Sequence, residues 1–240
     1  MPDTSVTEGR QAQGSAVSLR RVTRLFDGLP AVSQIHLDLE VGENVWLCGT
    51  NGSGKSTLLR VIATALSPTF GEGAVLGHDL RRERNRIRSR VELLGHQSRL
   101  YGDLTAGENL RFAATLFGLD PRLASSVLER VGLADVVDVR TASFSQGMRQ
   151  RMALARCLLR DPALILLDEP YAGLDVEARV LVDDLLRDAR ARGRTVVLAS
   201  HEAPPGDLVD RVVLLDAGRV QSTSGPAEAA LPRTPPVVAQ

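Results

Sequence analysis

The chain has 240 residues, enough to bury one large core, and 43% hydrophobic with 24% charged residues is the composition of a globular domain. Its 29 basic and 29 acidic side chains cancel, which argues against a dedicated nucleic-acid binder, because such proteins are usually basic. Two cysteines exclude a disulfide framework and favour a reducing compartment, and neither a signal core nor an apolar run of about 18 residues, the length that spans a bilayer, is present.

The first half of the chain predicts short strands followed by a strand, a loop and a helix. We expect a folded domain over residues 17–225, between disordered tails at 1–16 and 226–240. Residues 17–45 predict strands, with alternating apolar positions at Ile35, Leu37, Leu39 and Val41. The run NVWLCG predicts a buried strand, and the run after the glycine-rich loop has helical spacing at Leu58, Val61, Ile62 and Ala65.

The second half alternates helices with strands. Residues 106–134 predict two helical pieces broken between Gly118 and Pro121, and residues 145–160 predict a loop that runs into a helix. ALILLD, TVVLAS and RVVLLDAG predict strands, with a helix over residues 176–192 between the first two. This alternation predicts an α/β fold with a mainly parallel sheet covered by helices on both sides.

A phosphate-binding motif stands between the predicted strand and helix. GTNGSGKS fits G-x-x-x-x-G-K-[ST], in which glycines let successive backbone N–H groups point at an anion. The N-terminus of the following helix adds a partial positive charge. We therefore expect ATP to be bound by Gly49, Thr50, Asn51, Gly52, Ser53, Gly54, Lys55, Ser56 and Thr57.

Lys55 is the only lysine in a chain that otherwise uses arginine. A slim point charge can reach the β- and γ-phosphates, whereas the planar fork of arginine is bulkier and directs its hydrogen bonds differently. The adjacent Ser56 hydroxyl is expected to bind Mg²⁺.

Two carboxylates follow the predicted strand ALILLD. Asp168 ends the strand, where ligands bind in such sheets, and is expected to hold Mg²⁺ directly or through water. Glu169 is expected to act as general base on the attacking water. The alternative is that the two carboxylates are solvated turn residues before Pro170. It is less favoured because the phosphate motif lies upstream.

The stretch SFSQGMRQRMALARCLLRDPALILLDEPYAGLD, residues 143–175, resembles the signature-to-Walker-B region of ABC-type ATPases. The usual signature is Leu-Ser-Gly-Gly-Gln; here it reads FSQGM, so that Ser145 and Gly147 match. The resemblance covers residues 17–225. It implies a RecA-like P-loop ATPase core with an N-terminal antiparallel β portion and a helical subdomain inserted over about 95–158.

The resemblance also implies an assembly and its cofactors. The cofactors would be ATP and Mg²⁺, and Ser145 and Gly147 would contact ATP held by the other subunit of a homodimer. That dimer would sit on a separate polytopic membrane permease at the cytoplasmic face of the inner membrane. No nucleic acid is expected as a partner: the arginine-rich run over residues 81–90 is better explained as a solvated helix face.

Further positions match the family singly. His201, after the strand TVVLAS, matches the switch histidine that contacts the γ-phosphate, and Asp175 matches the D-loop. Phe26 would stack on adenine, with a core phenylalanine as the alternative. The glutamine expected to contact Mg²⁺ is Gln97, but the spacing is one residue short, and His96 is the alternative.

The sequence pattern GHQ…LT…ENL.F resembles that of the ATP-binding subunit of the cytochrome c maturation haem exporter. This implies haem export for cytochrome c biogenesis. The FSQGMRQR run is also similar to drug- and polysaccharide-type exporters, which are the alternative. A soluble ABC ATPase without a transport role is a third.

Overall fold

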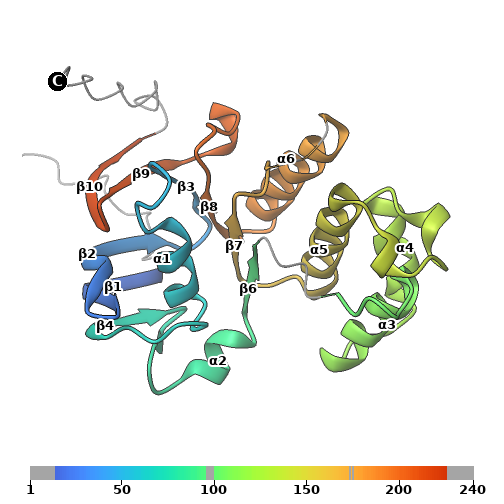
Figure 1. Cartoon of the computed structure of the whole chain (residues 1–240), viewed down its shortest axis with the longest axis horizontal. Helices are drawn as coiled ribbons and strands as arrows, with labels where there is room; N and C mark the ends of the chain where they lie inside the picture. The colour runs from blue at the N-terminus through green and yellow to red at the C-terminus, as the bar shows by residue number, and fades with distance from the viewer. Residues whose placement is uncertain (1–13, 96–99, 173, 175, 226–240) are drawn as a thin grey trace, which may run out of the picture.

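The computed structural model describes residues 14–95, 100–172, 174 and 176–225. An antiparallel sheet, a larger mainly parallel sheet and a group of helices follow one another across the molecule (Figure 1). This is the α/β arrangement that the sequence pattern predicts, with the N-terminal antiparallel portion that the resemblance implies. Across the described residues, no helix has both the length and the apolar character needed to cross a membrane.

The antiparallel sheet is formed by the N-terminal strands in the order β2-β1-β4-β5. Its strands are β1 (Ser15–Phe26), β2 (Leu29–Glu40), β4 (Phe70–Val75) and β5 (His78–Asp79). Strand β1 begins at Ser15, two residues before the expected boundary at Val17, and Ala16 is fully buried in it; the domain bounds themselves stay a prediction. The alternation predicted for β2 is confirmed at Ile35, Leu37 and Leu39, which are buried. It fails at Val41, which is exposed because the chain turns at Gly42 with a φ of +87°.

The larger sheet has the order β10-β9-β3-β8-β7-β6. Its strands are β3 (Asn44–Cys48), β6 (Val91–Leu94), β7 (Leu164–Asp168), β8 (Thr195–Ala199), β9 (Arg211–Asp216) and β10 (Arg219–Ser224). All neighbours pair in parallel except β10, which is antiparallel to β9. Strands β3, β7 and β8 are buried at every residue, as expected for parallel strands covered on both faces.

Helix α1 (Lys55–Ile62) follows the loop after β3 and packs with both sheets in one hydrophobic cluster. Leu58, Val61 and Ile62 are buried as predicted. The prediction was wrong at Ala65, which is exposed and lies beyond the helix, because Thr64 has a left-handed φ of +56° and ends it.

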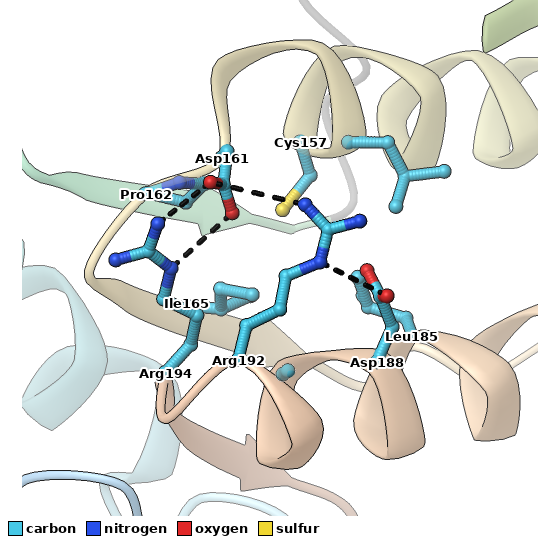
Figure 2. A pocket seen from close by; sticks show the side chains of 10 residues that line it. Cys157, Asp161, Pro162, Ile165, Leu185, Asp188, Arg192 and Arg194 are labelled. Atoms are coloured by element: carbon cyan, nitrogen blue, oxygen red, sulfur yellow. Dashed lines mark hydrogen bonds and ion pairs between the residues drawn. The ribbon is translucent and has the colours of Figure 1, made fainter.

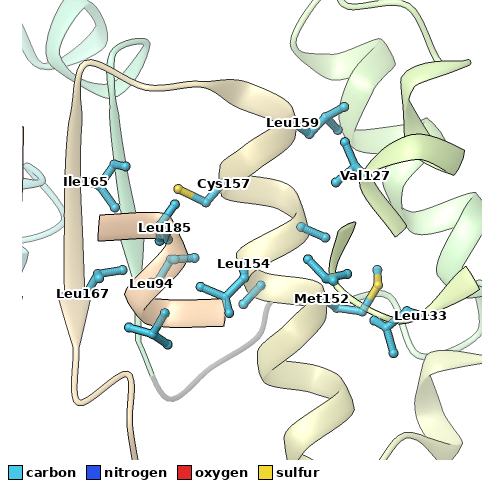
Figure 3. Packing of buried hydrophobic residues seen from close by; sticks show 14 of the residues in the cluster. Leu94, Val127, Leu133, Met152, Leu154, Cys157, Leu159, Ile165, Leu167 and Leu185 are labelled. Atoms are coloured by element: carbon cyan, nitrogen blue, oxygen red, sulfur yellow. The ribbon is translucent and has the colours of Figure 1, made fainter. Parts of the chain in front are cut away.

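The helical part lies between β6 and β7 in the chain, with α3 (Ala106–Leu116), α4 (Leu123–Arg130) and α5 (Gln146–Arg160). The predicted break falls between α3 and α4, where Gly118 has a φ of +69°. Figure 3 shows Leu154 and Cys157 of α5 directed toward β7 and α6 (Val176–Ala191), while Met152 and Leu159 lie toward the other helices. Helix α5 therefore joins the helical part to the parallel sheet through two apolar sides.

Short elements complete the described chain. They are α2 (Arg84–Arg88), which carries part of the arginine-rich run, and the 3₁₀ turns η1 (Ala134–Val136), η2 (Thr141–Ser143) and η3 (Gly206–Leu208).

Candidate functional site

The loop between β3 and α1 has a backbone that only glycine accommodates at two positions. Gly49 has a φ of +151°, and a Cβ there would lie 2.1 Å from the carbonyl oxygen of Leu215. Gly54 has a φ of +103°, and a Cβ there would lie 2.4 Å from the carbonyl oxygen of Ala31. The loop is thus wrapped tightly by the neighbouring strands, with its glycines at the points of closest approach.

We expect the substitution Gly54→Ala to destabilise the fold by about 1–3 kcal/mol and to weaken ATP binding, because the backbone must move away from Ala31. Thermal unfolding and equilibrium ATP binding measure the two effects. Gly206→Ala is the matched control, since a Cβ there meets nothing within 4 Å and its φ is not left-handed. Unchanged unfolding temperature and ATP affinity for Gly54→Ala would contradict the role given to this glycine.

The Lys55 side chain lies inside this loop, with only 6% of it exposed. Its Nζ donates to the carbonyl oxygens of Gly49 at 2.8 Å and Thr50 at 3.1 Å. The same nitrogen lies 3.7 Å from Oε1 of Glu169. The single lysine therefore joins the loop to the carboxylate that follows β7.

Ser56 and Asp168 bring two oxygen ligands together at the first turn of α1 and the end of β7. The Ser56 hydroxyl donates to Oδ1 of Asp168 at 2.8 Å, and Asp168 is 4% exposed. A hydroxyl beside a carboxylate fits Mg²⁺, which takes oxygen ligands and is held by one or two carboxylates together with substrate phosphates. Among the described residues no group of three or more His, Cys, Asp or Glu could hold a metal ion.

Glu169 is held in a left-handed conformation with a φ of +50°, and its backbone N–H donates to Ala199 at the end of β8. Such strained non-glycine residues cluster at functional sites. Its Oε2 lies 2.9 Å from Nδ1 of His201. The predicted general base is therefore fixed between Lys55 and His201.

The segment around His201 is anchored on both sides. Trp46 of β3 donates its indole N–H to the carbonyl oxygen of Ser200 at 3.1 Å. Glu202 accepts a hydrogen bond from Arg179 at 2.8 Å, and this bond lowers the pKa of the Glu202 carboxyl. His201 itself is left exposed on about half of its side chain, beside Glu169.

Ser145 and Gly147 lie at the N-terminus of α5. The Ser145 side chain accepts a hydrogen bond from the backbone N–H of Met148, which caps the helix. Ser145 is exposed and Gly147 is half-buried. An exposed, capped helix N-terminus is suited to an anion brought by another molecule.

Phe26 lies at the end of β1 with 42% of its surface exposed, so it stands outside the core, contrary to the alternative interpretation. The guanidinium of Arg24 lies 4.7 Å from the centroid of its ring. Stacking on adenine stays a prediction. Gln97, His96 and Asp175 lie outside the described residues, so their expected roles also stay predictions.

Several residues around the carboxylates could not be predicted from the sequence. A cavity of about 210 Å³ beside Asp168 and Glu169 is also lined by Gly95, Gln146, Arg149, Gln150 and Ala172. The Gln150 side chain donates to the carbonyl oxygen of Pro170 at 3.3 Å. The FSQGMRQR run contains three of these residues, but nothing in its spacing indicates which side chains approach β7.

The sequence of the chain matches a known protein family. The family model described as "ABC transporter" matches residues 32–172. The chain is 35% identical to the "ABC transporter ATP-binding protein NatA" of Bacillus subtilis, over 79% of this chain and 80% of the relative. It is 33% identical to the "Daunorubicin/doxorubicin resistance ATP-binding protein DrrA" of Streptomyces peucetius, over 90% and 68%. It is 35% identical to the "Nod factor export ATP-binding protein I" of Rhizobium johnstonii, over 85% and 67%.

Solved structures agree with the sequence relatives. One is an ATP-binding cassette solved as a dimer in a post-hydrolysis state with ADP and Pi, with a TM-score of 0.80 and 27% identity, covering 88% of this chain and 98% of that one. Another is CbiO1 of Clostridium perfringens, described as part of an ABC transporter complex, with a TM-score of 0.76 and 25% identity, covering 90% of each chain. With the phosphate loop, the two carboxylates and the histidine gathered at one place, the chain belongs to the ABC transporter family, as an ATP-hydrolysing subunit.

Proposed function

We propose that this chain is the ATP-hydrolysing motor of a membrane exporter and that its reaction centre is formed by Lys55, Ser56, Asp168, Glu169 and His201. The observation that carries the proposal is the arrangement around Glu169, which lies 3.7 Å from the Lys55 ammonium and 2.9 Å from His201. A base, a phosphate-binding cation and a hydrogen-bonding group thus converge on one small volume.

Each of these residues has a separate task in the proposed reaction. Lys55 and the loop N–H groups bind the phosphates, and Ser56 and Asp168 would hold Mg²⁺, which would neutralise part of the phosphate charge. Glu169 accepts the proton of the water that attacks the γ-phosphorus, while ADP leaves with the electrons of the broken P–O bond. His201 donates a hydrogen bond near the γ-phosphate and keeps Glu169 oriented.

The single lysine allows a direct test of nucleotide binding at the loop. We expect ATP at ten times its Kd to slow acylation of Lys55 by an amine-reactive reagent by about tenfold, because only the nucleotide-free fraction reacts. Peptide mass spectrometry measures the rate, and the N-terminal amine in the same sample serves as internal control. Equal rates at Lys55 with and without ATP would contradict phosphate binding by this residue.

We further propose that two copies form a homodimer, in which Ser145 and Gly147 of one subunit contact ATP held by the loop of the other. The exposed, capped N-terminus of α5 supports this, and so does the relative solved as a dimer with ADP and Pi. The dimer would associate with a separate polytopic permease at the cytoplasmic face of the inner membrane, with no nucleic acid as partner. CbiO1, described as part of a transporter complex, supports such an assembly.

The relatives favour a drug- or polysaccharide-type exporter over a haem exporter. Their names refer to Nod factor export and to daunorubicin and doxorubicin resistance. Haem export for cytochrome c biogenesis rests on the resemblance of the GHQ…LT…ENL.F pattern and stays a prediction. A soluble ABC ATPase without a transport role is the least supported alternative.

The cargo class is tested by capture of the membrane partner. Tagged Glu169→Gln chain is purified with ATP from detergent-solubilised membranes of its own organism, with tagged Lys55→Ala chain as control. A polytopic protein retained only by the first, without a haem absorption band, supports the drug- or polysaccharide-type proposal. Cytochrome c maturation subunits with a haem band would replace it with haem export. Absence of any membrane protein would contradict the exporter proposal itself.

A further inference from the structure

The last residue of α5, Arg160, joins three elements through one side chain. Its Nη1 donates to the carbonyl oxygen of Val91 at 2.9 Å and to Oε2 of Glu92, both in β6. Its Nη2 donates to the carbonyl oxygen of Arg88 at the end of α2. Its guanidinium also lies 4.9 Å from the ring centroid of Phe117, which follows α3. The Arg160 side chain, which is 14% exposed, thus connects α5 to the sheet, to α2 and to the residue that follows α3.

Glu92 is the acidic partner of this contact. Its side chain is 10% exposed in a strand whose other residues are Val and Leu. Nη2 of Arg156, one turn earlier in α5, lies 3.9 Å from its Oε1. A carboxylate in such a position needs its cation, because loss of one partner leaves an uncompensated buried charge. The position of α5 against β6 is therefore set by charge geometry as well as by apolar packing.

Both elements lead from this ion pair to the reaction centre. Strand β6 runs on to Gly95, where a Cβ would lie 3.8 Å from the Cβ of Asp168. Helix α5, with 15 residues, extends about 22 Å from Arg160 back to Ser145, at 1.5 Å per residue. If α5 tilted about its Arg160 end, the displacement would grow along the helix and would be largest at Ser145, its other end.

We propose that Glu92 and Arg160 are positioning residues: their ion pair fixes the angle of α5 against β6, and so places Ser145 and Gly147 of one subunit on the nucleotide of the other. This inference rests on the proposed dimer. It assigns a role in turnover to two residues that do not touch the nucleotide.

The test compares Glu92→Gln, Arg160→Gln and the double variant with wild-type full-length chain. We expect each single variant to lower kcat by about tenfold or more, because displacement of a reacting group by about 1 Å can cost about a hundredfold. The ATP affinity of each isolated variant chain should stay within about twofold of the wild-type affinity, because none of the substitutions lies in the loop that contains Lys55. The double variant should lower kcat by less than the product of the two single effects, because both substitutions remove the Glu92–Arg160 contact.

Arg194→Gln is the matched control. Arg194 precedes β8 and pairs with Asp161, the residue directly after Arg160, at 2.6 Å (Figure 2). This pair also anchors the C-terminal end of α5, but both side chains are about one third or more exposed, so it is weaker. Unchanged kcat is expected for this variant.

The inference is overturned if Arg160→Gln keeps the wild-type kcat, provided that the wild-type chain hydrolyses ATP and forms a dimer in the presence of ATP. Hydrolysis by wild-type chain without an ATP-dependent dimer would instead contradict the proposed assembly, and with it the trans placement inferred here. If Arg160→Gln does not fold, the apolar pair Glu92→Leu with Arg160→Met decides, because such replacements of buried ion pairs are often neutral for folding. Wild-type unfolding temperature with reduced kcat supports the positioning role, and wild-type kcat overturns it.

Discussion

The substitution Glu169→Gln is expected to lower kcat for ATP hydrolysis by roughly 100-fold or more, the contribution of a positioned general base, and to leave ATP affinity within about threefold. Glutamine keeps the shape of the side chain. Its amide can still contact His201, because the atom that replaces Oε2 would lie 2.9 Å from Nδ1. It cannot accept the proton of the attacking water. Phosphate release and equilibrium ATP binding, measured on the same preparation, separate the two quantities.

Glu202→Gln is the control for this variant. Glu202 also lies near His201, with 3.8 Å between its Oε1 and Nε2 of the ring, whereas Glu169 contacts the other ring nitrogen, and Glu202 is paired with Arg179. We expect it to retain nearly all of the turnover. If Glu169→Gln hydrolysed ATP at the wild-type rate, Glu169 would have no part in the reaction.

The substitution Lys55→Arg is expected to weaken ATP binding by about 10- to 100-fold although the charge is kept. Nζ of Lys55 fits between two carbonyl oxygens at 2.8 and 3.1 Å in an almost fully buried position. The planar guanidinium is larger and cannot place its donors at that single point. Titration with a fluorescent ATP analogue measures the affinity.

Lys55→Ala supplies the baseline for complete loss of the cation, and thermal unfolding shows whether each variant remains folded. Wild-type affinity for Lys55→Arg would mean that any positive charge serves in this loop. The retention of a single lysine in an arginine-using chain would then have no explanation in nucleotide binding.

Local sequence patterns were sufficient for the parts of the site that depend on neighbouring residues. The order β3, glycine loop, α1 follows from NVWLCG and the phosphate motif, and Asp168 ends β7 as the apolar run predicts. The break between α3 and α4 follows from Gly118. In each case the physical cause, a turn residue or a run of apolar side chains, lies within the segment itself.

Features that depend on distant residues could not be predicted in this way. Strand β6 escaped notice because its four residues include Glu92, which is buried only because Arg160 comes from 68 positions away. The polar strand β10 gives no apolar signal, since most of its residues are exposed. The left-handed conformation of Glu169 depends on its backbone bond to Ala199 in the next strand. Local periodicity carries no information about such pairings.

The most direct test of the account measures the particle mass of Glu169→Gln chain by light scattering, with and without ATP. A site shared between two subunits predicts that the mass doubles with ATP, and that Ser145→Arg in the same background keeps it at one chain while ATP still binds. A variant that stays monomeric in ATP, or a Ser145→Arg variant that dimerises equally well, would contradict the shared site.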